Sequence, residues 1–91
     1  MANTKSAIKR IRSSERKRQQ NRVHRSRART YVRKTVRYID EGDMEAAQDS
    51  LHHAIRALDR AAQKGVIHKN NAARRKSRLM KRCSQALEAH E

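Results

Sequence analysis

Residues 5–40 read KSAIKRIRSSERKRQQNRVHRSRARTYVRKTVRYID, a stretch that contains neither glycine nor proline. Residues 1–39 carry fourteen Lys or Arg and a single carboxylate, Glu15. Arg, Lys, Gln and Ala all favour the α-helix, so the stretch predicts one long basic helix. So much charge of one sign requires a polyanionic partner, and the phosphate backbone of a nucleic acid is the obvious one.

Only the second half of this helix has an apolar face. Its members recur at the spacing of one side of a helix and are Ala28, Tyr31, Val32, Thr35 and Ile39. Ile8, Ile11 and Val23, farther upstream, form no continuous stripe. The helical pattern runs from about Thr4 to Asp40, roughly 55 Å at 1.5 Å per residue. We therefore expect the first half to project as a basic arm beyond the bundle that the second half joins.

Two glycines divide the rest of the chain. Gly42 and Gly65 lie where helix C-caps are expected, while Asn3 or Thr4 suits the N-cap of the first helix and Asp43 that of the second. The apolar stripe of the second helix is Ala47, Leu51, Ala54, Ile55, Leu58 and Ala62, and that of the third is Ala72 or Ala73, Leu79, Met80, Cys83 and Leu87. The predicted helices cover residues 1–41, 43–64 and 68–89 within one domain, 1–91. The fold class is all-α, a three-helix antiparallel bundle with a long, basic, projecting first helix.

Composition excludes several classes. There is no Trp, Phe or Pro, which argues against β-sandwiches and barrels. Cys83 is the single cysteine, and no two histidines have the spacing of a zinc site, so we expect neither disulfide nor metal. No apolar run is long enough to span a membrane. Nothing resembles a catalytic constellation, and we expect no enzyme activity, no cofactor and no homo-oligomer.

Repulsion along the arm has a structural consequence. Six pairs of like charge stand four residues apart: Lys5–Lys9, Arg12–Arg16, Arg18–Arg22, Arg25–Arg29, Arg29–Arg33 and Arg33–Arg37. Each costs an isolated helix about 0.2–0.5 kcal/mol. We therefore expect the arm before about Arg25 to be disordered or to fray in the free protein, and to become ordered on phosphates.

The third helix carries a second basic patch, on the faces away from its apolar stripe. Its members are Lys69, Arg74, Arg75, Lys76, Arg78, Lys81 and Arg82. The helix start, residues 68–71, is either a phosphate seat or a capping turn without a ligand. Tyr31 and Tyr38 are expected to pack in or beside the core rather than to stack on bases, so phosphate and shape recognition should dominate. The acids of the second helix are expected to face solvent or to pair with neighbouring bases.

Several motifs resemble a known family. The opening ANTKSA (2–7), the run RSRART (25–30) and above all DRAAQKGVIHKNNAARRKSRL (59–79) are similar to the bacterial and plastid small-subunit ribosomal proteins of the S-twenty family. The similarity covers nearly the whole chain in the same order. It implies a three-helix bundle whose long helix penetrates between helices of small-subunit rRNA, with other small-subunit components nearby. It also implies a location on the cytoplasmic ribosome, or in the plastid stroma for a chloroplast protein.

The resemblance carries RNA contacts over to matching positions. In the first helix these are Lys5, Lys9, Arg10, Arg16, Lys17, Arg18, Arg22, Arg25 and Arg29, and after Gly65 they are His68, Lys69, Asn70, Arg74, Arg75 and Arg78. The charge pattern adds Arg12 and Lys76. Ile8 stands where a basic residue is common in the family, which places that one contact in doubt.

Two other classes fit the composition less well. A histone-like, DNA-compacting protein is compatible with the charge, but the chain lacks an evident dimerisation surface, an apolar wedge and a proline-containing minor-groove arm. A membrane-active basic helix needs a large apolar face opposite the basic one, and the arm has none.

Overall fold

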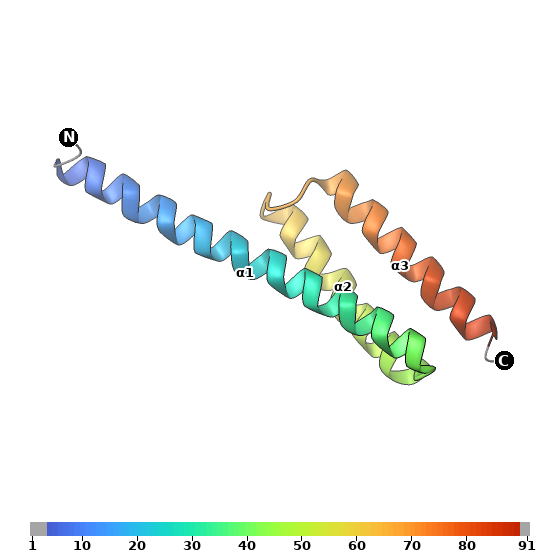
Figure 1. The fold of residues 1–91 in the computed structure, drawn as a ribbon. Helices are drawn as coiled ribbons and strands as arrows, with labels where there is room; N and C mark the ends of the chain where they lie inside the picture. The colour runs from blue at the N-terminus through green and yellow to red at the C-terminus, as the bar shows by residue number, and fades with distance from the viewer. Residues whose placement is uncertain (1–3, 90–91) are drawn as a thin grey trace.

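The computed structural model describes residues 4–89, which form three α-helices and no strand. Helix α1 spans Lys5–Glu41, α2 spans Met44–Gln63 and α3 spans Lys69–Ala89. Figure 1 shows α2 running back along the second half of α1, and α3 running back along α2. The predicted all-α bundle with a long first helix is therefore confirmed. Asn3, the alternative N-cap, and the ends of the predicted domain lie outside the described residues.

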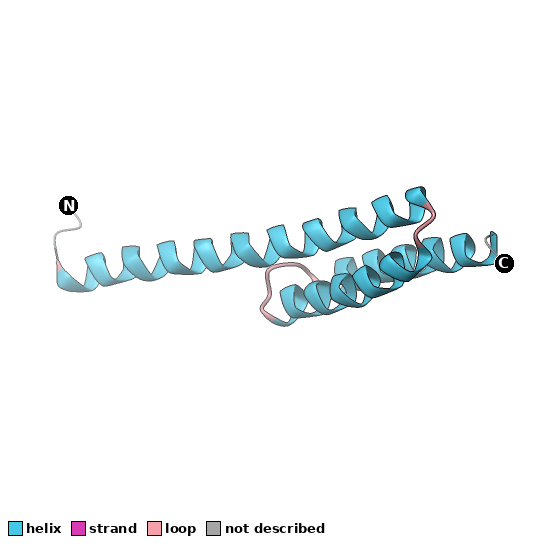
Figure 2. Cartoon of the chain, turned by 90° about the horizontal axis from the view of Figure 1, so that it is seen from below, coloured by secondary structure: helices cyan, strands magenta, loops and turns pink. Residues whose placement is uncertain are grey.

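The molecule is elongated because half of α1 has no partner helix. Its principal dimensions are 65 × 22 × 16 Å, and its radius of gyration is 17.8 Å. A compact chain of this length has a radius of gyration of about 12 Å. Seen from below, α1 extends far beyond the two shorter helices (Figure 2). The residues before about Asn21 thus form the arm, and the remainder forms the bundle.

Both glycines adopt the left-handed conformation that ends a helix. Gly42 has φ 78°, and its N–H donates to the carbonyl oxygen of Ile39 at 3.1 Å. Gly65 has φ 74° and directly follows Lys64, the C-cap residue of α2. Side chains other than glycine strain this backbone region, so these two positions determine where the chain reverses.

Side-chain caps begin the first two helices. The hydroxyl oxygen of Thr4 accepts a hydrogen bond from the N–H of Ala7 at 3.3 Å. A carboxylate oxygen of Asp43 accepts one from the N–H of Ala46 at 3.2 Å. Each cap satisfies one of the backbone donors that a helix start leaves without a partner.

The core is thin and rich in alanine. Its buried apolar residues are Ala28, Ile39, Ala47, Ala54, Ala57, Leu58, Ala61, Val66, Ala72, Leu79 and Cys83. Leu58 is the largest of these that is fully buried, at 0% exposure. Tyr31 and Tyr38 pack against the core as expected. Small side chains allow the helices to approach closely, but they supply little apolar area for each residue.

The structure corrects the predicted stripes at several positions. Met80 is 50% exposed, and Ala73 is also exposed. Because α3 packs mainly against α2, its buried face is narrow, and Met80 lies one residue, or about 100°, beyond buried Leu79. On α2, Ser50, Ala57 and Ala61 are buried although the stripe omitted them. This helix contacts both neighbours, so its buried face is wider than one stripe.

A pair of buried hydroxyls joins α1 to α2. Thr35 is 0% exposed, and its hydroxyl lies 2.8 Å from the carbonyl oxygen of Tyr31 and 3.0 Å from the hydroxyl of Ser50. The Ser50 hydroxyl in turn lies 3.3 Å from the same Tyr31 oxygen. The two hydroxyls satisfy one another inside the core, which fixes the register of the two helices.

The arm is helical from Lys5 in the structure, and the expected fraying of the free protein in solution stays a prediction. From Ile8 to Gln20 every residue is exposed, so no other helix holds it. Its helix continues directly from the packed half of α1, and extending an existing helix avoids the unfavourable nucleation step. Together with the Thr4 cap and the high helix propensity of its residues, this continuity opposes the repulsion between like charges.

Candidate nucleic-acid interface

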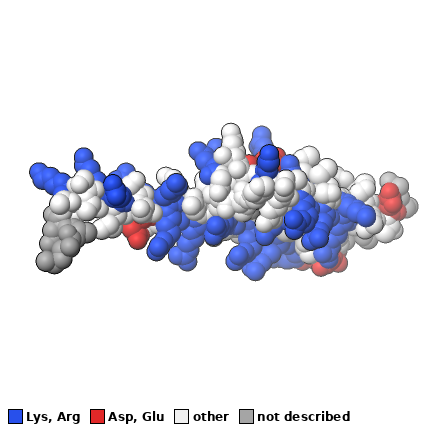
Figure 3. Space-filling view, turned by 90° about the horizontal axis from the view of Figure 1, so that it is seen from above, with Lys and Arg blue, Asp and Glu red and all other residues white. Residues whose placement is uncertain are grey.

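Basic side chains follow α1 along its length. The space-filling view in Figure 3 shows Lys and Arg on the arm and across the bundle, with acidic atoms confined to small patches. In the arm, Arg18 lies 4.0 Å from the exposed carboxylate of Glu15. A surface ion pair this exposed is worth little, so the arm keeps its strong positive potential.

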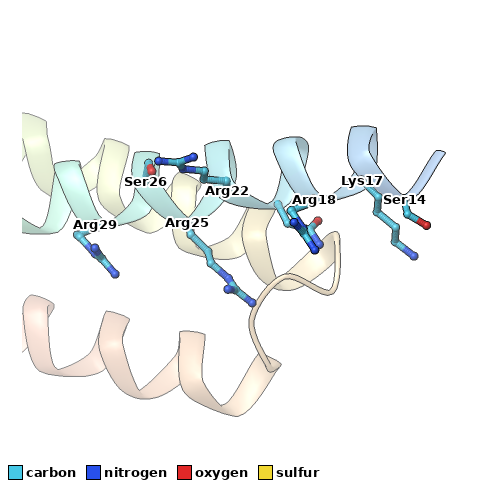
Figure 4. A pocket seen from close by; sticks show the side chains of 8 residues that line it. Ser14, Lys17, Arg18, Arg22, Arg25, Ser26 and Arg29 are labelled. Carbon is cyan, nitrogen blue, oxygen red and sulfur yellow. The ribbon is translucent and has the colours of Figure 1, made fainter. Parts of the chain in front are cut away.

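One side of α1 bears a shallow basic hollow. It is lined by Ser14, Lys17, Arg18, Asn21, Arg22, Arg25, Ser26 and Arg29. Figure 4 shows Arg25 and Arg29 pointing from α1 toward α3 and the turn before it, while Arg22 lies along α1 beside Ser26. The spacing of three and four residues places most of these groups on one flank of the helix. The hollow therefore presents guanidinium and ammonium groups together with hydroxyl and amide groups, all suited to phosphate oxygens.

The two basic segments of the sequence, one on α1 and one on α3, lie close together at the end of this hollow that is nearest to α3. Arg25 and Arg29 of α1 line a common hollow with residues of the α2–α3 turn and of α3, and we term it the α1–α3 hollow. The residues on that side are Val66, Ile67, His68, Asn71 and Arg75. Arg25 Nη2 donates to the carbonyl oxygen of Val66 at 3.3 Å. This bond holds the α2–α3 turn against α1 and places His68 at the edge of the hollow. Segments far apart in the sequence thus form one cationic surface.

The start of α3 caps itself. The Nδ1 atom of His68 accepts a hydrogen bond from the N–H of Asn70 at 3.1 Å, and its carbonyl oxygen accepts one from Ala72 at 3.1 Å. The imidazole therefore occupies one of the backbone donors that an anion would use at a helix N-terminus. A capping turn is therefore present at this segment, the ring lies exposed beside Arg29 and Arg75 in the α1–α3 hollow, and a phosphate seat here stays a prediction.

The remaining predicted contact residues lie outside the α1–α3 hollow. Those on the arm and its base are Lys5, Lys9, Arg10, Arg12, Arg16, Lys17, Arg18 and Arg22, and those on α3 are Lys69, Asn70, Arg74, Lys76 and Arg78. All of these are exposed except Lys76. The structure thus brings Arg25, Arg29, His68 and Arg75 together in the α1–α3 hollow. It also brings Lys17, Arg18 and Arg22 together with Arg25 and Arg29 in the hollow along α1, and the other predicted residues are distributed along α1 and α3.

Lys76 differs from its neighbours because it has a partner within the protein. Its side chain is 29% exposed, and Nζ lies 2.6 Å from Oδ1 of Asp59 on α2. A carboxylate at this distance cancels much of the positive potential that a phosphate would meet. The pair contributes to α2–α3 packing, in line with the expectation that acids of the second helix pair with bases.

This difference predicts unequal effects of two adjacent substitutions. Replacing Arg75 with Gln should weaken binding to small-subunit rRNA about 4- to 5-fold at 0.15 M salt, the value of one phosphate contact. Replacing Lys76 with Gln should weaken it less than about 2-fold, because Asp59 already neutralises that charge. Filter-binding titrations of both variants measure the difference, with thermal melts as a control for folding. Equal losses would show that Lys76 leaves Asp59 to contact RNA.

A second set of bases was missed by the sequence analysis. Arg27 of α1 and Arg56, Arg60 and Lys64 of α2 line hollows at the seam between these helices. The signal was available in part, since residues 56, 60 and 64 recur at the spacing of one helix face. Their relation to Arg27 depends on the packing of α2 on α1, which no local pattern encodes.

The described residues, 4–89, also bear on metal binding and on membrane insertion. Within this range no group of His, Cys, Asp and Glu has the arrangement needed to hold a metal ion. Over the same residues, no helix has both the length and the apolar character required to cross a bilayer.

Comparison with known proteins gives a consistent result. Residues 2–84 match the family model described as Ribosomal protein S20. A protein of Thermomicrobium roseum, named small ribosomal subunit protein bS20, is 56% identical over 98% of this chain and 90% of its own length. Proteins of the same name from Dictyoglomus turgidum and Beutenbergia cavernae are 50% and 54% identical, over 99% and 92% of this chain and 97% and 98% of their own lengths.

Proposed function

The chain belongs to the ribosomal protein S20 family, and from this premise we propose that it binds small-subunit rRNA directly and holds packed RNA helices in place. Members of this family are structural constituents of the small ribosomal subunit and not enzymes. Direct contact with rRNA, through phosphates and shape, is the specific role proposed for residues 1–91 acting as one domain.

The observation that supports this proposal most strongly is the α1–α3 hollow. It joins Arg25 and Arg29 to His68 and Arg75 on one surface, with the arm continuing from it as an exposed basic helix. Because helix packing sets the positions from which these side chains extend, their polar groups suit some arrangements of phosphates better than others. The arm then adds positive charge that contacts RNA phosphates beyond the bundle.

The mechanism is neutralisation of phosphates at a junction of RNA helices. Close approach of RNA helices is opposed by the charge of their backbones, and a cationic rod between them removes that repulsion. No Trp or Phe is present, and Tyr31 is stacked on His53 with ring centroids 5.2 Å apart. The aromatic surface that base stacking requires is therefore engaged within the protein, which favours backbone and shape recognition.

The test compares small-subunit rRNA with duplex DNA of equal length at about 0.3 M salt, where non-specific attraction is weak. We expect nanomolar binding to rRNA to persist and binding to DNA to be lost. If about eight phosphates are contacted, log K should fall with log salt at a slope of roughly −6 to −7. Equal loss on both nucleic acids would contradict the proposal and favour a general polyanion binder of the DNA-compacting kind.

We also propose that the protein acts as a monomer on the ribosome, beside other small-subunit components. Sedimentation of the free protein checks the first point, because a second copy would double the mass. Association with gradient-purified small subunits checks the second.

A further inference from the structure

Helix α3 is held mainly by α2 and only weakly by α1. It packs along α2, and few of its residues contact α1 (Figure 1). Its buried residues are Ala72, Leu79 and Cys83, of which only Leu79 has a large apolar side chain. Because the free energy of docking rises with the apolar area buried, this face contributes little for a helix of 21 residues. Elements with few buried apolar contacts are the ones that separate from a fold in sub-global openings.

Charge opposes the docking of α3 beside α1. Helix α1 carries fourteen bases against three acids, and α3 carries seven bases against one acid. Where the two helices approach one another, Arg25 and Arg29 line the α1–α3 hollow with Arg75, and no carboxylate is among its lining residues. Like charges that face one another across a hollow repel, and separating the two helices relieves that repulsion.

Few polar contacts oppose this repulsion. Within residues 4–89, α3 forms one ion pair with each of the other helices. Arg82 lies 3.4 Å from the carboxylate of Asp40 on α1, but both side chains are more than half exposed, so the pair is worth little. The stronger pair, Lys76 with Asp59, connects α3 to α2 and leaves the repulsion across the α1–α3 hollow unchanged.

We propose that α3 opens away from the α1–α2 pair in the free protein, and that phosphate bound in the α1–α3 hollow closes it. A phosphate between Arg29 and Arg75 replaces their repulsion by attraction to both, so it binds the closed form more tightly than the open form. A ligand with such a difference in affinity shifts the population toward the form that it prefers. Opening is a property of the free protein, whereas closure by rRNA rests on the proposed function.

The thiol of Cys83 reports the opening of α3. Its side chain is 4% exposed and packs in one cluster with Ile39 of α1 and Ala47 of α2, so both helices cover it while α3 is docked. It is also the only cysteine of the chain. N-ethylmaleimide, an uncharged reagent, should therefore label it at a rate set by how often α3 is open. Hydrogen exchange at the amide of Thr35, buried where α1 joins α2, measures global unfolding in the same sample.

The experiment compares these two rates in the full-length protein. Labelling should indicate an open population at least about 10-fold larger than the globally unfolded one. Arg29→Gln/Arg75→Gln removes the facing charges and should slow labelling about 5-fold. Arg33→Gln/Lys81→Gln is the matched control, because it removes one charge from each of the same helices outside the hollow, and it should change the rate less than about 2-fold.

Two phosphate sources test the closure. Inorganic pyrophosphate should slow labelling of the wild-type protein about 3-fold more than sodium chloride of equal ionic strength does, and Arg29→Gln/Arg75→Gln should lose this difference. Small-subunit rRNA at a free concentration of about 100 times its Kd should slow labelling of the wild-type protein about 100-fold.

The outcomes separate this inference from the proposed function. Labelling no faster than global unfolding would overturn the opening. Equal rates for Arg29→Gln/Arg75→Gln and the wild-type protein would overturn it too, because fraying of the last turns of α3 would then expose Cys83. Equal effects of pyrophosphate and sodium chloride would overturn closure by phosphate. If pyrophosphate slowed labelling and rRNA did not, the proposed function would fail while closure by phosphate stood. Arg75→Gln alone repeats the comparison if a melt shows that the double variant is unfolded.

Discussion

A chain that begins at Asn21 should fold as the bundle does in the whole protein and lose roughly 10³- to 10⁴-fold in affinity for small-subunit rRNA at 0.15 M salt. The removed residues carry seven bases, Lys5, Lys9, Arg10, Arg12, Arg16, Lys17 and Arg18, against one acid. At this salt concentration one phosphate contact contributes about 4- to 5-fold through counterion release. Five or six contacts from the arm therefore account for the expected loss.

Folding should survive because the arm contributes nothing to the core. Each residue from Ile8 to Gln20 is exposed, and the buried face of α1 begins at Ala28. The melting temperature of the shortened protein should stay within a few degrees of the full-length value. The change should also appear in the salt dependence, as a slope shallower by about 4 to 5.

Calorimetry and filter binding on the two proteins provide the measurements. A matched control replaces Ser6, Ser13 and Gln19, uncharged and exposed residues of the arm, with Ala, which preserves charge and helicity. If the shortened chain bound rRNA as tightly as the whole protein, the arm would have no part in recognition. A large fall in melting temperature would instead show that the arm stabilises the bundle.

The substitution Leu58→Ala should destabilise the free protein by about 3 kcal/mol, within the range for large-to-small changes in a core. Leu58 has 0% exposure and packs in the cluster of Ala28, Ala57 and Ala72. The other buried members of this cluster are alanines, whose side chains cannot extend into the cavity, and the larger Tyr31, Val32 and Ile67 pack only at its edge. For a domain of this size the loss corresponds to a fall in melting temperature of roughly 12–24 °C.

Met80→Ala is the matched control, because sequence alone places Met80 in the same type of apolar stripe although it is 50% exposed. It should cost less than about 1 kcal/mol. Thermal denaturation followed by circular dichroism at 222 nm measures both variants without RNA. Equal melting temperatures for the two variants would show that Leu58 is not the centre of the core.

Local signals account for most of what was correctly predicted from the sequence. The absence of glycine and proline over residues 5–40 predicts a single α1, and the two glycines mark the ends of α1 and α2. The lack of a large apolar stripe in the first half of α1 predicts a projecting arm, and the residues from Ile8 to Gln20 are all exposed as expected. These properties depend on neighbours within one or two turns of helix, which a sequence displays directly.

Packing between helices decided what the sequence could not. The exposure of Met80, the burial of Ser50 and the pairing of Lys76 with Asp59 each depend on how a helix is rotated against its neighbour. An apolar stripe specifies that rotation only to within about one residue, or 100°. An error of one residue in the predicted rotation is therefore enough to place a surface side chain in the core, or a core side chain on the surface.

The candidate interface shows the same division. Charge and apolar period along the sequence by themselves determined that the protein is basic and helical, and they predict a polyanionic partner. Only the tertiary structure decided that Arg25 and Arg29 meet His68 and Arg75, and that Arg27 meets Arg56 and Arg60 on the opposite flank. The physical reason is that a charge acts over the distance to its spatial neighbours, and the close packing of three helices sets those distances.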